Sequence, residues 1–328
     1  MLSSVAEKVY WLGRYLERIE NSARLMDVYS GMIFDMPRDT KISWEILLDI
    51  TGSHEEFSER FTNTNEATII RFLIADEKHS GSLISCLKLL RENARTTREI
   101  LPAETWTEIN DTYLKTRKML ESGLGRKVRS ELFPELISDC QRLSGLLYSC
   151  MSHNTVFFFI QLGRLLERAD MTTRIVDVGS ITLLPAFAKF RREGLLLEPF
   201  ENVVWMNVLL SLSGYQAYRQ TVHNRVKGVA VVRFLLQDRD FPRSLNYCLS
   251  RLGHFLEQLP NNGEVLRAVL RVKRLTQDAV VDSLLEKGLL NFIDELQISI
   301  GDIHEVITAN WFRPDLVEDM QQSESLFD

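Results

Sequence analysis

The chain of 328 residues is 45% apolar and 26% charged, with a formal net charge of −6. This balance is typical of a soluble globular protein with a substantial core, and it argues against a dedicated nucleic-acid-binding protein. The sequence contains no apolar run of the roughly 18 residues that a membrane span needs and no signal-peptide pattern at its start. We therefore expect a cytoplasmic location.

Helical periodicity covers nearly the whole chain and strand-like alternation is almost absent, which predicts an all-α protein. The first helix is expected to begin at a capping box, Ser4-Val5-Ala6-Glu7, and to end near Gly31. One side of this helix is apolar. The other side is polar and carries Arg14, Glu17, Arg18, Asn21 and Arg24.

Several further helices are predicted before the middle of the chain. Ser43 and Asn65 are expected to cap two short helices, and Ser80 is expected to begin a long helix that stops before Pro102. Two more are predicted over residues 103–122 and 130–152, the latter with Pro134 in its first turn.

Residues 153–155 come directly before the next long helix and are expected to cap it, Thr155 in particular. The remaining helices are predicted over residues 199–214, 228–237, 244–259, 264–286 and 289–310.

One polar pattern occurs twice along the chain. Residues 12–28 and 162–178 share a Leu-Gly-Arg-x-Leu-Glu-Arg run followed by an acid, an arginine and Asp-Val, with every matched pair 150 residues apart. Residues 71–87 match 233–249 at a spacing of 162, so the second copy is expected to hold an insertion near residues 179–199. Such internal similarity predicts a duplicated architecture.

We predict a pseudo-twofold helical bundle built from two tandem copies of a roughly 150-residue unit. The first copy covers residues 1–153 and the second covers 154–313, packed together as one unit because the joint is so short. Residues 314–328 are expected to form a flexible acidic tail.

The matched polar residues have two interpretations. In one, the two Glu–Arg sets meet and lock the copies together; in the other, they line a cleft and bind an anion, since a guanidinium grips carboxylate or phosphate with two hydrogen bonds. Glycine inside a helix costs about 1 kcal/mol, so the two matched glycines predict close packing. The candidate ligand- or partner-binding residues are Arg14, Glu17, Arg18, Asn21, Arg24, Arg164, Glu167, Arg168, Asp170 and Arg174.

The paired Gly-Arg-x-x-Glu-Arg run resembles the signature of the bacterial alpha-E family, a group of all-helical proteins named for this Glu-Arg motif. Residues 11–18 and 163–172 carry the resemblance, which extends over nearly the whole chain. Such proteins tend to be encoded beside ATP-grasp ligase-like proteins and transglutaminase-like cysteine peptidases. The resemblance therefore implies these partners and a role in making or processing a peptide, but no reaction mechanism.

The sequence offers no nucleophile-and-base set, P-loop, zinc pattern or di-iron Glu-x-x-His pair, so we expect neither a metal nor a cofactor. The four cysteines form no C-x-x-C pair and are expected to be buried and apolar in character. Three hypotheses remain. We favour an accessory partner of the peptide system, then a structural charge lock, then an enzyme using Glu17 and Glu167 as acid or base.

Overall fold

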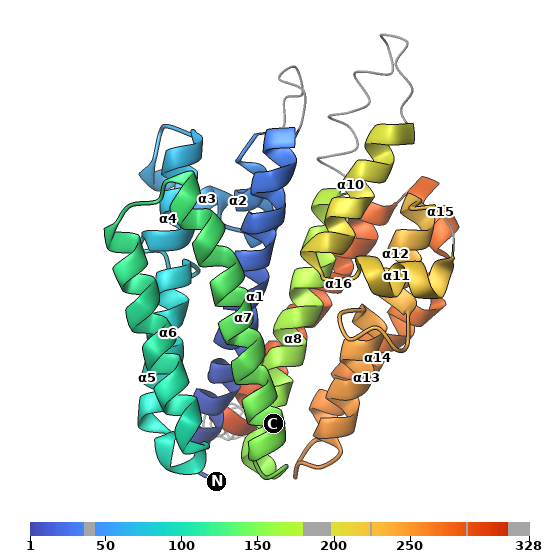
Figure 1. Ribbon diagram of the computed structural model, residues 1–328. Helices are drawn as coiled ribbons and strands as arrows, with labels where there is room; N and C mark the ends of the chain where they lie inside the picture. Colours follow the sequence, from blue (N-terminus) through green and yellow to red (C-terminus); the bar gives the residue numbers. More distant parts are fainter. Residues whose placement is uncertain (36–42, 180–197, 224, 287, 314–328) are drawn as a thin grey trace, which may run out of the picture.

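The computed structural model describes residues 1–35, 43–179, 198–223, 225–286 and 288–313, and within them it contains helices and no strand. The prediction of an all-α protein is confirmed. Two long helices, α1 (Ser3–Asp35) and α8 (Thr155–Val178), pack against each other in the middle of the molecule (Figure 1). The predicted insertion and acidic tail lie almost wholly outside the described residues.

The first half of the chain builds a four-helix bundle around α1. Helices α5 and α7 both pack on α1, and α6 lies between them and closes the bundle (Figure 1). Three short helices connect α1 to α5, and a 3-10 turn, η1, precedes α6. The bounds are α2 (Ile46–Thr51), α3 (His54–Arg60), α4 (Glu66–Ala75), α5 (Leu83–Thr96), η1 (Arg98–Ile100), α6 (Ala103–Glu121) and α7 (Arg126–Cys150).

The second half is arranged around α8 in a similar way. Helices α13 and α16 both pack on α8, and α14 lies between them. The bounds are α10 (Glu198–Ser211), α11 (Tyr215–Val222), α12 (Gly228–Gln237), α13 (Leu245–Leu256), α14 (Gly263–Asp278), α15 (Val281–Glu286), α16 (Leu289–Ile307) and a π-helical turn, η4 (Thr308–Phe312).

The two bundles share one core and exchange contacts across the centre. Buried apolar side chains form a single cluster that includes both α1 and α8. Helix α2 packs mainly against α8 rather than α1, whereas α10 packs mainly against α1 rather than α8. Burying apolar surface between the bundles in this way holds α1 and α8 in a fixed relation.

Side-chain caps explain where several helices begin. Asn65 Oδ1 accepts a hydrogen bond from the backbone N–H of Thr68 (2.9 Å), which confirms the predicted cap of α4. Helix α5 begins at Leu83 because Ser82, not the predicted Ser80, provides its cap. Helix α8 is capped by Asn154 rather than Thr155, since Asn154 Oδ1 accepts from two backbone N–H groups.

Other predicted boundaries were wrong. Helix α1 continues past Gly31 to Asp35, and α7 begins at Arg126, which places Pro134 inside the helix instead of in its first turn. An internal proline costs about 3 kcal/mol, and the burial of Leu132 and Phe133 before it and of Leu136 after it offsets that cost. The predicted helix over residues 264–286 is divided into α14 and α15, and α3 and α11 had not been predicted.

Three of the four cysteines, Cys86, Cys140 and Cys248, are buried as expected, whereas Cys150 is exposed at the end of α7. Among the described residues, none of the helices combines the length and apolar character that crossing a membrane would require.

Candidate functional site between α1 and α8

The two central helices approach most closely at their matched glycines. A Cβ atom added to Gly13 would lie 2.2 Å from the carbonyl oxygen of Ile160, and one added to Gly163 would lie 2.1 Å from that of Tyr10. No real Cβ contact is this short, so only glycine allows the two backbones to meet here. The close packing predicted from the glycines is what the structure has.

This approach places Glu167 of α8 between two arginines of α1. Arg14 Nε donates to Glu167 Oε2 at 2.5 Å. Arg18 donates twice, from Nε to Oε1 at 2.5 Å and from Nη2 to Oε2 at 3.0 Å. The Glu167 side chain is only 3% exposed, so its charge is compensated by guanidinium groups rather than by water.

Glu17 of α1 has the corresponding surroundings on α8. Arg168 donates from Nε and Nη2 to the two carboxylate oxygens, both at 2.8 Å, and Arg164 Nη2 lies 3.4 Å from Oε2. The Glu17 side chain is fully buried. Each signature Glu is therefore held by the signature arginines of the other helix.

A further arginine, Arg243, completes the site around Glu17. It lies just before α13, and its Nη1 donates to Glu17 Oε1 (3.0 Å) and to Asn21 Oδ1 (2.5 Å). Its Nη2 donates to Glu20 Oε1 (2.7 Å), which also accepts from Arg24 Nη2 (2.9 Å). The guanidinium thus connects three acceptors along one face of α1.

The sequence comparison missed Arg243 for an identifiable reason. At the spacing of 162 residues, Arg243 matches Gly81. A comparison of the two matched sequence segments selects residues that both segments contain, and this arginine occurs in one only. Its position directly before the matched serines, Ser82 and Ser244, was the available signal.

The predicted site residues do not all lie in one place. Arg14, Glu17, Arg18, Arg164, Glu167 and Arg168 form one buried cluster between α1 and α8. Asn21 and Arg24 lie on the Arg243 side of it. Asp170 and Arg174 pair with each other on the opposite side, at 2.9 Å.

The arginines determine the charge state of both glutamates. Burial alone would raise the pKa of Glu17, but the charges of Arg168, Arg243 and Arg164 outweigh it and hold that pKa well below its usual range. Burial likewise opposes ionisation of Glu167, and Arg18 and Arg14 overcome it and lower the pKa to about 2. Both carboxylates are therefore ionised at neutral pH.

These lowered pKa values predict a loss of stability in acid. An unfolded glutamate titrates near 4.3. Because the folded values lie lower, each carboxylate contributes stability that is complete above the unfolded pKa and disappears as the pH falls through the folded one. We expect the melting temperature, followed by circular dichroism, to fall between about pH 5 and pH 2, and the fall to be shallower in Glu17→Gln. An equally steep fall in that variant would contradict this assignment.

A polar cavity of about 250 Å³ lies beside Glu167, on the side away from Arg243. Residues of α1, α8, the end of α2, α3 and the turn before α5 enclose it. They are Arg18, Ser22, Thr51, Gly52, Ser53, Glu56, His79, Ser80, Gly81, Glu167, Asp170, Met171 and Arg174. Three carboxylates and two guanidinium groups thus line it.

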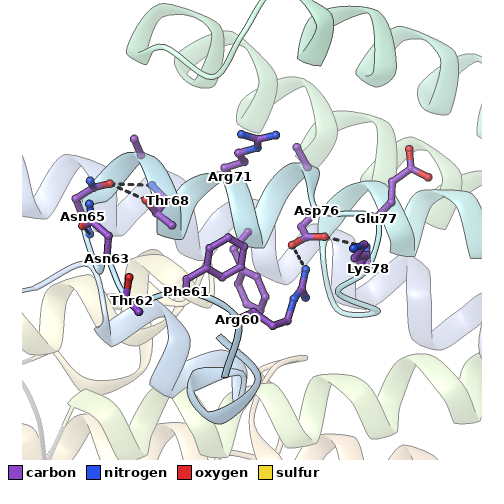
Figure 2. A pocket seen from close by; sticks show the side chains of 13 residues that line it. Arg60, Phe61, Thr62, Asn63, Asn65, Thr68, Arg71, Asp76, Glu77 and Lys78 are labelled. Atoms are coloured by element: carbon purple, nitrogen blue, oxygen red, sulfur yellow. Dashed lines mark hydrogen bonds and ion pairs between the residues drawn. The ribbon is translucent and has the colours of Figure 1, made fainter. Parts of the chain in front are cut away.

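A larger surface groove of about 900 Å³ lies along α4 (Figure 2). In Figure 2, Arg60 reaches Asp76 at one end of it, and Asn65 caps α4 at the other. Arg60 Nη1 also donates to Glu56 Oε1 (3.0 Å), and Glu56 Oε2 is 2.7 Å from His79 Nδ1. A chain of polar contacts therefore joins this groove to the cavity beside Glu167.

Two further features of the described residues concern metal ligands and thiols near the cluster. In the part of the chain that the structure describes, no three His, Cys, Asp or Glu side chains are grouped so that they could hold a metal ion. The thiols of Cys86 and Cys248, which lie near the cluster, have their pKa raised by burial to about 11 and about 12. Neither is a reactive thiolate at neutral pH.

The chain is similar to known proteins over most of its length. Uncharacterized proteins of Mycobacterium bovis and Mycobacterium tuberculosis are 22% identical to the chain over 333 aligned positions, which cover 93% of this chain and 36% of theirs. The chain thus spans about a third of the length of these relatives. No solved structure matches it. Residues 1–312 match the model of a family described as a predicted alpha-helical domain with a conserved ER motif, and the chain therefore belongs to the Alpha-E family.

Proposed function

We propose that the chain is a non-catalytic accessory protein that acts with an ATP-grasp ligase-like protein and a transglutaminase-like cysteine peptidase, in the cytoplasm, on a peptide that they make or process. The partners come from the family resemblance. The observation that carries the non-catalytic role is the enclosure of Glu17 and Glu167 by arginines. A general acid must be protonated near the working pH, and both pKa values are held far too low for that.

We also infer that residues 1–153 and 154–313 are tandem copies related by a pseudo-twofold axis. The exchanged Glu–Arg pairs and the reciprocal glycine contacts support this. So do contacts farther from the centre: Cys86 Sγ lies 3.6 Å from the carbonyl oxygen of Ser80, and Cys248 Sγ lies 3.6 Å from that of Pro242. Cys248 and Pro242 each lie 162 residues after their counterparts Cys86 and Ser80, so the two contacts occupy matched positions.

In this proposal the Glu–Arg cluster is a lock between the copies, and the locked pair is the binding unit. Buried ion pairs can fix the relative position of the elements that they join, even where their net energy is small. A rigid unit loses less conformational entropy when it binds. Anion binding by the same arginines is not favoured, because an anion would have to displace Glu17 or Glu167.

The mycobacterial relatives give further support. In each of them, the region similar to this chain is 36% of the protein, so the similar region is covalently joined to other sequence. A unit that works alongside another protein is compatible with such an arrangement.

The test is direct association of purified proteins. The chain and an ATP-grasp ligase-like protein encoded near its gene, which the family resemblance predicts, should co-elute in size-exclusion chromatography and bind with a Kd of about 1 μM or tighter, which corresponds to about −8 kcal/mol. An ATP-grasp protein from an unrelated pathway is the control. The accessory role is wrong if no complex forms at tens of micromolar, or if the chain alone converts a peptide and Glu17→Gln abolishes that conversion.

A further inference from the structure

The cavity beside Glu167 occupies the position that Arg243 fills in the other half. Helix α1 presents Glu17 and Glu20 to Arg243, and α8 presents the matched Glu167 and Asp170 to the cavity. The segment before α13 inserts Arg243, whereas the matched segment before α5 has Gly81, which also lines the cavity. The cavity therefore has carboxylates that match those of the Arg243 site but no arginine side chain at the matched position.

The flanking contacts confirm that the two sites are built alike. Ser244 Oγ donates to the carbonyl oxygen of Asp238 at 2.5 Å, and Ser82 Oγ donates to that of Asp76 at 2.8 Å. The ring at position 241 stacks on Phe234 with 4.8 Å between centroids, and His79 stacks on Phe72 at 4.2 Å. These flanking contacts are made at matched positions, although the stacked ring is Phe241 in one half and His79 in the other.

Hydrogen-bonding capacity is left over on the open side. Glu17 Oε1 accepts from both Arg168 and Arg243, whereas for Glu167 Oε1 the described residues supply one donor, Arg18. Likewise Glu20 Oε1 accepts from Arg24 and Arg243. The matched Asp170 accepts at Oδ2 from Arg174, and its Oδ1 receives no donor among the described residues.

The side chains that line the cavity are more exposed than their counterparts around Arg243. The side chains of Arg18, Asp170 and Arg174 are 26%, 19% and 31% exposed. Their counterparts Arg168, Glu20 and Arg24 are 13%, 5% and 13% exposed. A guanidinium group in the cavity would cover the first set as Arg243 covers the second.

We propose that this cavity binds a guanidinium group supplied by a ligand, in the place that Arg243 occupies in the other half. The proposal rests on the proposed function in treating the chain as a binding protein. It adds the chemical class of what is bound, which is an arginine side chain of a peptide or a free guanidinium compound. At about 250 Å³ the cavity is smaller than the roughly 300–1,000 Å³ of sites for drug-sized ligands, and it suits a group of side-chain size.

The neighbouring arginines do not oppose this assignment. Arg243 sits beside Arg168 and Arg24, and both of those guanidinium groups are directed to carboxylates. Arg18 and Arg174 are directed to Glu167 and Asp170 in the same way. Met171 takes the place of the acceptor Asn21, and Glu56 from α3 adds a carboxylate that the filled site lacks.

Calorimetric titration of the purified full chain tests the proposal without any partner protein. The probes are N-acetyl-arginine amide, its neutral citrulline counterpart, and the tripeptide acetyl-Gly-Arg-Gly-amide. We expect one site that binds the arginine compound about tenfold or more tightly than the citrulline compound, because charge-assisted hydrogen bonds are the stronger ones. Tighter binding of the tripeptide would identify a peptide as the source, and equal binding a free compound. Equal affinity for arginine and citrulline, or no binding, would overturn the proposal.

Two variants place the ligand in the cavity. Gly81→Arg supplies the missing side chain from the backbone and should abolish binding. Its Cβ would lie 2.9 Å from Nε2 of the buried His79 ring, so that ring has to shift and a somewhat lower melting temperature is expected. Asp170→Asn, which introduces no bulk, should weaken binding about tenfold. Undiminished binding in either folded variant would place the ligand elsewhere.

The opposite variant gives an independent check. Arg243→Gly should create a second cavity, so the stoichiometry of N-acetyl-arginine amide should rise from one to two and the compound should raise the lowered melting temperature. A stoichiometry that stays at one would refute the equivalence of the sites. Because all of these readouts use the chain alone, failure to bind the ligase-like protein would leave them unaffected.

Discussion

Glu17→Ala is expected to lower the free energy of unfolding by about 3–5 kcal/mol, which is the cost of removing one partner from a buried ion pair. The substitution leaves Arg164 and Arg168 without a carboxylate and leaves Arg243 with Glu20 alone, in a site where the Glu17 side chain is fully buried. Since ordinary domains are stable by only 5–15 kcal/mol, the variant should be near the limit of folding. Urea unfolding followed by circular dichroism measures the effect.

Two comparisons make this result specific. Glu167→Ala should destabilise less than Glu17→Ala, because Glu167 pairs with two arginines beside a cavity that water can enter. Glu264→Ala, which removes an exposed pair with Arg267, should leave the unfolding midpoint nearly unchanged. If Glu17→Ala were as stable as Glu264→Ala, the cluster would not be a lock.

The sequence pattern was sufficient to select the central helices but not to describe their environment. Matched Gly, Arg and Glu positions identified the residues that meet between α1 and α8. Their spacing could not distinguish a cleft from a lock, because that depends on how closely two helices 150 residues apart approach each other. The structure has both features, a buried cluster and a cavity on one side of it.

Comparing the two matched segments cannot identify a functional residue that occurs in only one of them. Arg243 and Gly81 stand at matched positions with different chemistry, and this difference decides which side of the cluster is filled. Helix boundaries were missed for local reasons. Ser80 and Ser82 are equally good caps by residue type, and only the turn geometry places the Ser82 hydroxyl at the N–H of Ser85.

Gly13→Ala is expected to destabilise the protein by about 3 kcal/mol, at the upper end of the range for overpacking. The added methyl group would lie 2.2 Å from a backbone oxygen of α8, and a backbone oxygen cannot move aside as the end of a side chain can. Helices α1 and α8 would have to separate, which would also lengthen the Glu–Arg hydrogen bonds between them. Gly163→Ala should have an effect of similar size, since its Cβ would meet the carbonyl oxygen of Tyr10 at 2.1 Å.

Gly145→Ala and Gly301→Ala are the matched controls, because both glycines are exposed within helices and have no atom within 4 Å of an added Cβ. There alanine should stabilise by up to about 1 kcal/mol through its better helix propensity. If the change in unfolding free energy is negative at Gly13 and positive at Gly145 and Gly301, the effect at Gly13 comes from backbone contact and not from helix propensity. If Gly13→Ala also stabilised the protein, α1 and α8 could not be in contact at Gly13, and the geometry that brings Glu17 to Arg168 would be lost with that contact.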